Sequence, residues 1–136
     1  MLAQNIGKTI IVLALAALLL LSFAACASES ENQIDYEQIS GDEAKALMDS
    51  ESEYIIIDAR TEAEYAEGHI PGAILIPEYE ISEQAEAKLP DKDELILVYC
   101  RSGRRSKIAA EELVKLGYTN VKEFGGIIDW KYEIEN

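Results

Sequence analysis

Three short, unbroken apolar runs restrict the fold of this sequence more than any other feature. They cover residues 54–57, 73–76 and 95–99, and a fourth segment with strand character covers residues 121–124. None of the three runs alternates apolar with polar side chains, which is the pattern of strands buried on both faces of a sheet. Strands of this kind occur in parallel sheets, so the sequence predicts a mainly parallel sheet.

Helix signals separate these strands. Two capping boxes, each a hydroxyl residue followed three positions later by a glutamate, are Ser40 with Glu43 and Thr61 with Glu64. The first predicts a helix that ends near Ser50. The second predicts a short helix through Ala66, with Gly68 in the left-handed position after it.

Two further helices are expected at residues 82–89, before Pro90, and at residues 106–116, before Gly117. Strands that alternate with helices imply a small α/β domain with helices on both faces of the sheet. The chain of 136 residues is long enough for one such domain, which we place at residues 37–136. Ligands of these sheets bind at the carboxyl ends of the strands.

Cys100 lies at such an end, directly after the most hydrophobic run. It begins a short turn into the next helix, and the backbone N–H groups of such a turn converge on an anion. Four of the chain's 12 Lys and Arg residues follow within seven positions: Arg101, Arg104, Arg105 and Lys107. Both features favour a thiolate, so we expect a lowered pKa and a reactive cysteine. The alternative is a buried structural cysteine beside a solvated basic turn.

The rest of the chain is strongly acidic. It has 26 Asp and Glu residues and a formal net charge of −14. This charge argues against a nucleic-acid partner. The expected ligands are small molecules or a protein, bound where the local charge differs from that of the whole chain.

The amino-terminal residues have the pattern of a secretory signal. Lys8 precedes an apolar run at residues 10–21, which is shorter than the ~20 residues of a spanning helix. Residues 23–26 (Phe-Ala-Ala-Cys) resemble the lipobox of bacterial lipoproteins, although Phe23 stands where leucine is usual. In that motif the cysteine, here Cys26, is lipidated and becomes the first mature residue.

We therefore interpret residues 1–25 as a signal peptide, Cys26 as a lipidation site and residues 26–36 as a polar tether. This interpretation places the domain outside the cytoplasm, anchored to a membrane by lipid. Three alternatives remain open: an uncleaved membrane anchor, plain secretion, and a disulfide between Cys26 and Cys100.

Four motifs of the domain agree with one known family. They are residues 57–60 (Ile-Asp-Ala-Arg), 64–73 (Glu-Tyr-Ala-Glu-Gly-His-Ile-Pro-Gly-Ala), 100–106 (Cys-Arg-Ser-Gly-Arg-Arg-Ser) and 125–130, where Gly-Gly is followed by Trp130. With these motifs, residues 37–136 resemble the rhodanese-like family of single-domain sulfurtransferases. The resemblance implies a five-stranded α/β sheet and an enzyme that carries sulfur on Cys100.

In such an enzyme the Cys100 thiolate attacks the outer sulfur of an anionic donor such as thiosulfate. Sulfite leaves, a persulfide remains on Cys100, and a thiol or cyanide accepts the sulfur. The loop that would bind the donor consists of Arg101, Ser102, Gly103, Arg104, Arg105 and Ser106. No metal or organic cofactor is required.

Other motif residues have supporting roles in this interpretation. Asp58 and Arg60 are expected to form an ion pair that orients the loop, and His69 to serve the scaffold rather than to act as a base. A non-catalytic persulfide-sensing or protein-binding module is the alternative, although such modules usually lack the cysteine. A phosphatase or arsenate reductase is a weaker alternative, because the phosphatase motif needs arginine where this chain has Ser106.

Overall fold

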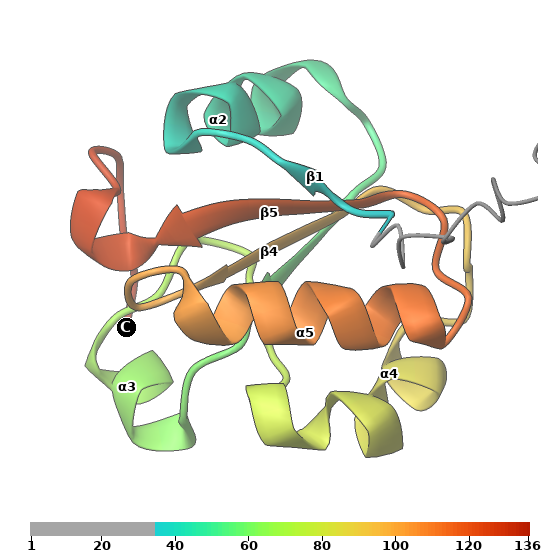
Figure 1. The fold of residues 1–136 in the computed structure, drawn as a ribbon. Coiled ribbons are helices and arrows are strands. Elements are labelled where there is room, and N and C mark those ends of the chain that lie inside the picture. Colours follow the sequence, from blue (N-terminus) through green and yellow to red (C-terminus); the bar gives the residue numbers. More distant parts are fainter. Residues whose placement is uncertain (1–34) are drawn as a thin grey trace, which may run out of the picture. The chain divides into compact units, whose positions relative to one another are not determined.

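A five-stranded parallel sheet is the centre of the structure, a computed structural model that describes residues 35–136 (Figure 1). The strands are β1 (Glu37–Gln38), β2 (Ile55–Asp58), β3 (Ile74–Leu75), β4 (Ile96–Cys100) and β5 (Val121–Gly126). Their order across the sheet is β1-β5-β4-β2-β3, and every pairing is parallel. The predicted fold class is therefore confirmed.

Helices cover both faces of this sheet. They are α2 (Gly41–Ser50), α3 (Glu62–Glu67), α4 (Ile81–Lys88) and α5 (Arg104–Lys115), with 3-10 turns η1 (Glu78–Glu80) and η2 (Ile127–Asp129). Helix α2 lies on one face, and α4 and α5 lie on the opposite face (Figure 1). Both predicted capping boxes are present, at the starts of α2 and α3.

Strand β4 divides the core into two layers, because successive side chains of a strand point to opposite faces. Ile96, Val98 and Cys100 pack with the α4 and α5 side, whereas Leu97 and Tyr99 pack with the α2 side. All five residues are buried. The apolar run that predicted this strand has no solvated face, as expected.

Several boundaries differ from the predictions. Strand β1 was not predicted, because its two residues are polar and exposed. Helix α5 begins at Arg104, two residues earlier than expected, so the loop after Cys100 is shorter. Gly68 ends α3 with φ +146° and ψ +137°, an extended conformation with positive φ rather than the left-handed helical one.

The amino-terminal predictions concern residues outside the described part of the chain. The predicted signal peptide, Cys26 and residues 26–34 of the tether lie outside the described residues. Within residues 35–136, none of the helices combines the length and apolar character needed to cross a membrane. At the other end, Glu135 exchanges two backbone hydrogen bonds of 2.8 Å with His69.

Candidate active site

Cys100 is the last residue of β4, and the loop that follows encloses its sulfur. The Gly103 N–H donates to Sγ at 3.0 Å, and the Ser106 hydroxyl lies 3.4 Å from Sγ. Burial by itself raises the pKa of the thiol, but hydrogen bonds from Ser106 and from the N–H groups of Gly103 and Ser102 outweigh it. The pKa of Cys100 therefore lies below its usual value. The sequence predicted this direction from the loop N–H groups and the arginines together, and the hydrogen bonds of the loop are the larger cause.

Two glycines allow the loop to fold over the sulfur. Gly103 has φ +103°, a left-handed conformation, directly before α5. Gly126 lies against the loop backbone, so a Cβ there would overlap the Arg101 carbonyl and come within 2.6 Å of the Ser102 Cα. The loop thus packs backbone against backbone on β5, which holds its N–H groups beside Sγ.

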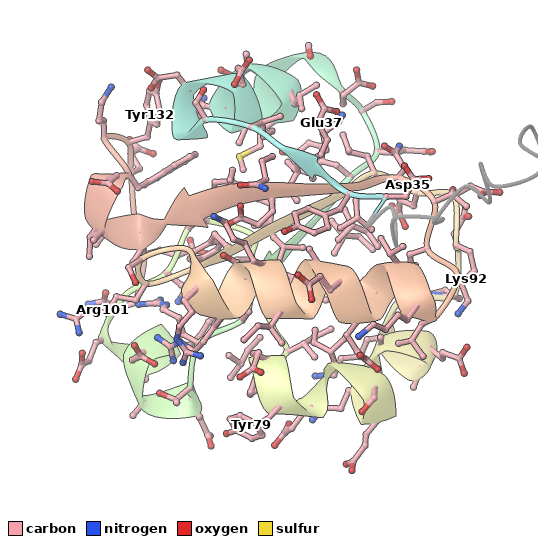
Figure 2. The ribbon with its side chains drawn as sticks, viewed as in Figure 1. Asp35, Glu37, Tyr79, Lys92, Arg101 and Tyr132 are labelled. Carbon is pink, nitrogen blue, oxygen red and sulfur yellow. The ribbon has the colours of Figure 1, made fainter. Side chains whose placement is uncertain are left out.

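The three arginines of the loop have different surroundings. Arg101 and Arg104 are exposed, and Figure 2 shows Arg101 projecting into solvent. Arg105 is half-buried, and its Nη1 and Nη2 donate to the Glu64 carboxylate at 2.7 and 2.8 Å. This pairing holds the pKa of Glu64 well below its usual range. The sequence analysis gave the three arginines the same role, whereas in the structure Arg105 is paired with a carboxylate of α3.

Ser106 turns its hydroxyl inward, toward Glu123 on β5. The Ser106 Oγ to Glu123 Oε1 distance is 2.6 Å, and both residues are buried. The sequence analysis did not predict Glu123 as a site residue. Its position between Val121 and Phe124 indicates an inward side chain, because alternate residues of a half-buried strand point to the core.

Asp58, the last residue of β2, forms a buried ion pair with Arg60. Arg60 Nη2 lies 2.7 Å from Asp58 Oδ2 and also donates to the Gly68 carbonyl at 2.7 Å. Tyr99 donates its hydroxyl to the same Asp58 oxygen at 2.6 Å and accepts from the Ile70 N–H at 3.1 Å. Burial, followed by the contact with Asp58, raises the pKa of Tyr99 well above its usual value. This buried network joins β2, β4 and the turn at residues 68–70.

His69 makes its polar side-chain contacts away from the sulfur. Its ring stacks on Tyr65 with centroids 3.7 Å apart, and Nδ1 lies 3.0 Å from the Tyr65 carbonyl oxygen. Its Nε2 lies 3.5 Å from Glu135 Oε1. These contacts fix the turn at residues 68–72 against the carboxyl-terminal residues.

One cavity of the surface lies apart from the active loop. A cavity of about 510 Å³ beside α2 is lined mainly by apolar and aromatic side chains, including Met48, Tyr54, Ile70 and Trp130. Residues 100–106 do not line it. Within residues 35–136, no three His, Cys, Asp or Glu side chains are grouped as metal ligands.

Known proteins are similar to this chain in sequence and in fold. The family model for the rhodanese-like domain matches residues 40–133. Thiosulfate sulfurtransferase PspE of Escherichia coli (strain K12) is 42% identical over 73 residues, which are 54% of this chain and 70% of that protein. A sulfurtransferase of Allochromatium vinosum is 40% identical over 100 residues, covering 73% of this chain and 87% of the relative. A solved E. coli rhodanese with anions is 37% identical, with a TM-score of 0.58 over 61% of this chain and 98% of that one.

Proposed function

Because this chain belongs to the rhodanese-like domain family, we propose that it is a sulfurtransferase that moves sulfane sulfur through a persulfide on Cys100. The family model covers most of the domain, and the relatives that carry the name sulfurtransferase match the same region. The proposed donor is thiosulfate or a similar small anion. The proposed acceptor is a thiol, for which cyanide substitutes in an assay.

The single observation that carries this proposal is the set of donors around Cys100 Sγ. The loop N–H groups and the Ser106 hydroxyl stabilise negative charge on the sulfur of Cys100, a residue that is 1% exposed. A thiolate held in this way is a nucleophile without the help of a base. The site is thus prepared for attack on an electrophilic sulfur.

In the first half-reaction the Cys100 thiolate attacks the outer sulfur of thiosulfate. The new S–S bond forms as the S–S bond of the donor breaks, and sulfite leaves with the electron pair. One negative charge resides on the enzyme sulfur before the step and one after it, so no proton is gained or lost. In the second half-reaction the acceptor takes the outer sulfur and the Cys100 thiolate is restored.

The arginines have separate roles in this proposal. Arg101 and Arg104 lie exposed at the mouth of the loop, where their charges attract a dianionic donor to an otherwise acidic protein. Arg105 is paired with Glu64, so its charge is largely balanced within the protein. We therefore assign donor attraction to Arg101 and Arg104 and loop positioning to Arg105.

The proposed location rests on the amino-terminal sequence alone. The resemblance of residues 23–26 to a lipobox supports lipidation of Cys26, removal of residues 1–25 and anchoring on the outer side of a membrane. Detergent partitioning and the intact mass of the mature protein test this. A protein that keeps residues 1–25, or that lacks the acyl mass, would contradict the anchoring proposal but not the sulfurtransferase.

The catalytic proposal is tested by mass spectrometry after incubation with thiosulfate. We expect a gain of about 32 Da, the mass of one sulfur in a persulfide, on the peptide that contains Cys100. Cys100→Ser should lose both this gain and thiosulfate:cyanide transfer, whereas Cys26→Ser should retain both. Hydrolysis of an aryl phosphate without sulfur loading would favour the phosphatase alternative and overturn the proposal.

A further inference from the structure

The hydroxyl of Ser106 lies between two groups that compete for its proton. It is 3.4 Å from Cys100 Sγ and 2.6 Å from Glu123 Oε1, and the carbonyl oxygens of Gly103 and Gly125 lie at 3.1 and 3.3 Å. Ser106 is 0% exposed, Cys100 1% and Glu123 2%. Water therefore has little access to this group of side chains.

A serine hydroxyl has one proton to donate. When that proton points to the carboxylate, the short O–H···O bond is charge-assisted and strong. When it points to Sγ, it stabilises the thiolate. The two hydrogen bonds exclude each other, so the strength of one determines the population of the other.

Glu123 is held in place for this role by a second donor. The Gly125 N–H donates to the same Oε1 at 2.8 Å, which fixes the carboxylate beside Ser106. The groups that can accept a hydrogen bond from Ser106 thus belong to the active loop and to β5. None of the sulfur-transfer steps described above uses Glu123.

We propose that Glu123 is a positioning residue of the active site, which competes with the Cys100 sulfur for the Ser106 proton and thereby limits how strongly the resting thiolate is stabilised. The proposal rests on Cys100 being the sulfur carrier of the proposed function. A less stabilised thiolate is more nucleophilic, because nucleophilicity falls as the thiol becomes more acidic.

The preferred acceptor of the Ser106 hydrogen bond changes as the negative charge moves during sulfur transfer. In the resting enzyme the charge lies on Sγ, which attracts the Ser106 proton. In the persulfide the charge lies on the outer sulfur and Sγ is neutral, so the Ser106 hydroxyl turns back toward Glu123. The carboxylate accepts a hydrogen bond in this step and no proton leaves Ser106, so the balance of the transfer is unchanged.

Other titratable groups lie near Glu123 and Cys100. Tyr36 before β1 and Glu111 on α5 lie on the Glu123 side, and Arg105 on α5, Glu64 on α3 and Asp58 on β2 lie on the Cys100 side. Burial and then Glu111 and Glu123 raise the pKa of Tyr36, and contact with Glu64 leads the causes that raise the pKa of Arg105. Because none of these groups bonds to the Ser106 hydroxyl, a double-mutant cycle through Ser106 separates their effects from that of Glu123.

The test measures the pH midpoint at which iodoacetamide alkylates Cys100, read from the Cys100 peptide by mass spectrometry. Four full-length proteins are compared: the parent, Glu123→Gln, Ser106→Ala and the double variant. Removal of the competing charge should lower the midpoint by about one pH unit in Glu123→Gln. Ser106→Ala should raise the midpoint, and in that background Glu123→Gln should produce less than half of its effect.

A second variant separates hydrogen bonding from charge. Glu123→Asp keeps the negative charge but withdraws the carboxylate from Ser106, so we expect the midpoint to fall here too. An unchanged midpoint in Glu123→Asp, or equal effects of Glu123→Gln with and without Ser106, would overturn the proposal. Thermal unfolding identifies any variant that does not fold. The readout requires no sulfur transfer, so a protein that failed as a sulfurtransferase would still give a result.

Discussion

The guanidinium of Arg105 faces the carboxylate of Glu64 in a two-pronged ion pair, with N–O distances of 2.7 and 2.8 Å. The same carboxylate accepts hydrogen bonds from the backbone N–H and the hydroxyl of Thr61, the residue that caps α3. One side chain therefore closes the start of α3 and fixes the first turn of α5. This contact couples the position of the active loop to a helix 41 residues earlier in the sequence.

Glu64→Gln should lower the KM for thiosulfate by about fivefold, because an unbalanced charge on Arg105 attracts the donor by roughly 1 kcal/mol at short range in a wet site. The kcat should change little, since the donors to Cys100 Sγ remain. Steady-state kinetics at low salt give both values. Glu62→Gln is the matched control, because Glu62 is an exposed acid of the same helix. A KM that falls equally in both variants would show that only net charge matters.

Glu64 also predicts a pH dependence of stability. Its pKa lies well below the usual value, chiefly because of Arg105, so the folded state binds this proton less readily than the unfolded state. The carboxylate therefore stabilises the protein above the unfolded pKa of about 4.3 and loses this contribution as the pH falls further. Urea unfolding of the parent and Glu64→Gln should differ most near neutral pH and converge progressively below about pH 4. A difference that grows on acidification would contradict this sign.

Arg101→Ala and Arg104→Ala should each raise the KM for thiosulfate, because both side chains are exposed at the loop. The effect should shrink in 1 M salt, where the Debye length is about 3 Å. Initial rates at two salt concentrations measure it. Lys115→Ala is the control, since Lys115 lies in the last turn of α5 and is 65% exposed in its side chain. An effect of the same size at both salt concentrations would require direct contact with the donor.

Tyr99→Phe should destabilise the fold by about 1.5–3 kcal/mol, because the buried Asp58 carboxylate loses a charged-group hydrogen bond. The matched control is Tyr118→Phe. Tyr118 donates to the neutral Leu89 carbonyl at 2.8 Å, so its loss should cost only about 0.5–1.5 kcal/mol. Denaturant unfolding measures both, and equal losses would mean that the charge of Asp58 adds nothing to the Tyr99 bond.

Gly126→Ala should cost at least about 1–3 kcal/mol, because the added Cβ would overlap the Arg101 carbonyl and displace the active loop. Alkylation of Cys100 should lose its low-pH reactivity in the same variant. Gly41→Ala is the control, since its Cβ would lie 3.6 Å from Trp130 in ordinary contact, and helix propensity favours alanine by up to about 1 kcal/mol. Normal Cys100 reactivity in Gly126→Ala would show that the loop tolerates the displacement.

The sequence predicted the elements whose causes are local. The capping boxes of α2 and α3 involve residues three positions apart, and the three apolar runs need no partner to be recognised. Strand β1 could not be recognised in this way. Its two exposed residues form a strand only because the edge of β5 is available for pairing.

Contacts within the site also divide into local ones, which the sequence predicts, and contacts between distant residues, which it does not. The lowered pKa of Cys100 could be predicted, because the donors lie within six positions of the cysteine. The partner of Arg105 lies 41 positions away, and the partner of Ser106 lies 17 positions away. Sequence motifs indicate which residues share the loop, but only the tertiary fold decides which carboxylate each of them meets.

Because β4 separates the core into two layers, the fluorescence of Trp130 can serve as an optical probe of the chemistry. Trp130 is the chain's one tryptophan, and it packs against Phe124 in the layer on the α2 side, whereas Cys100 belongs to the opposite layer. Its fluorescence therefore monitors a part of the protein that the sulfur does not touch. Emission that stays constant during persulfide formation would mean that the chemistry is confined to one layer. A change in emission would mean that the sheet transmits the event to its other face.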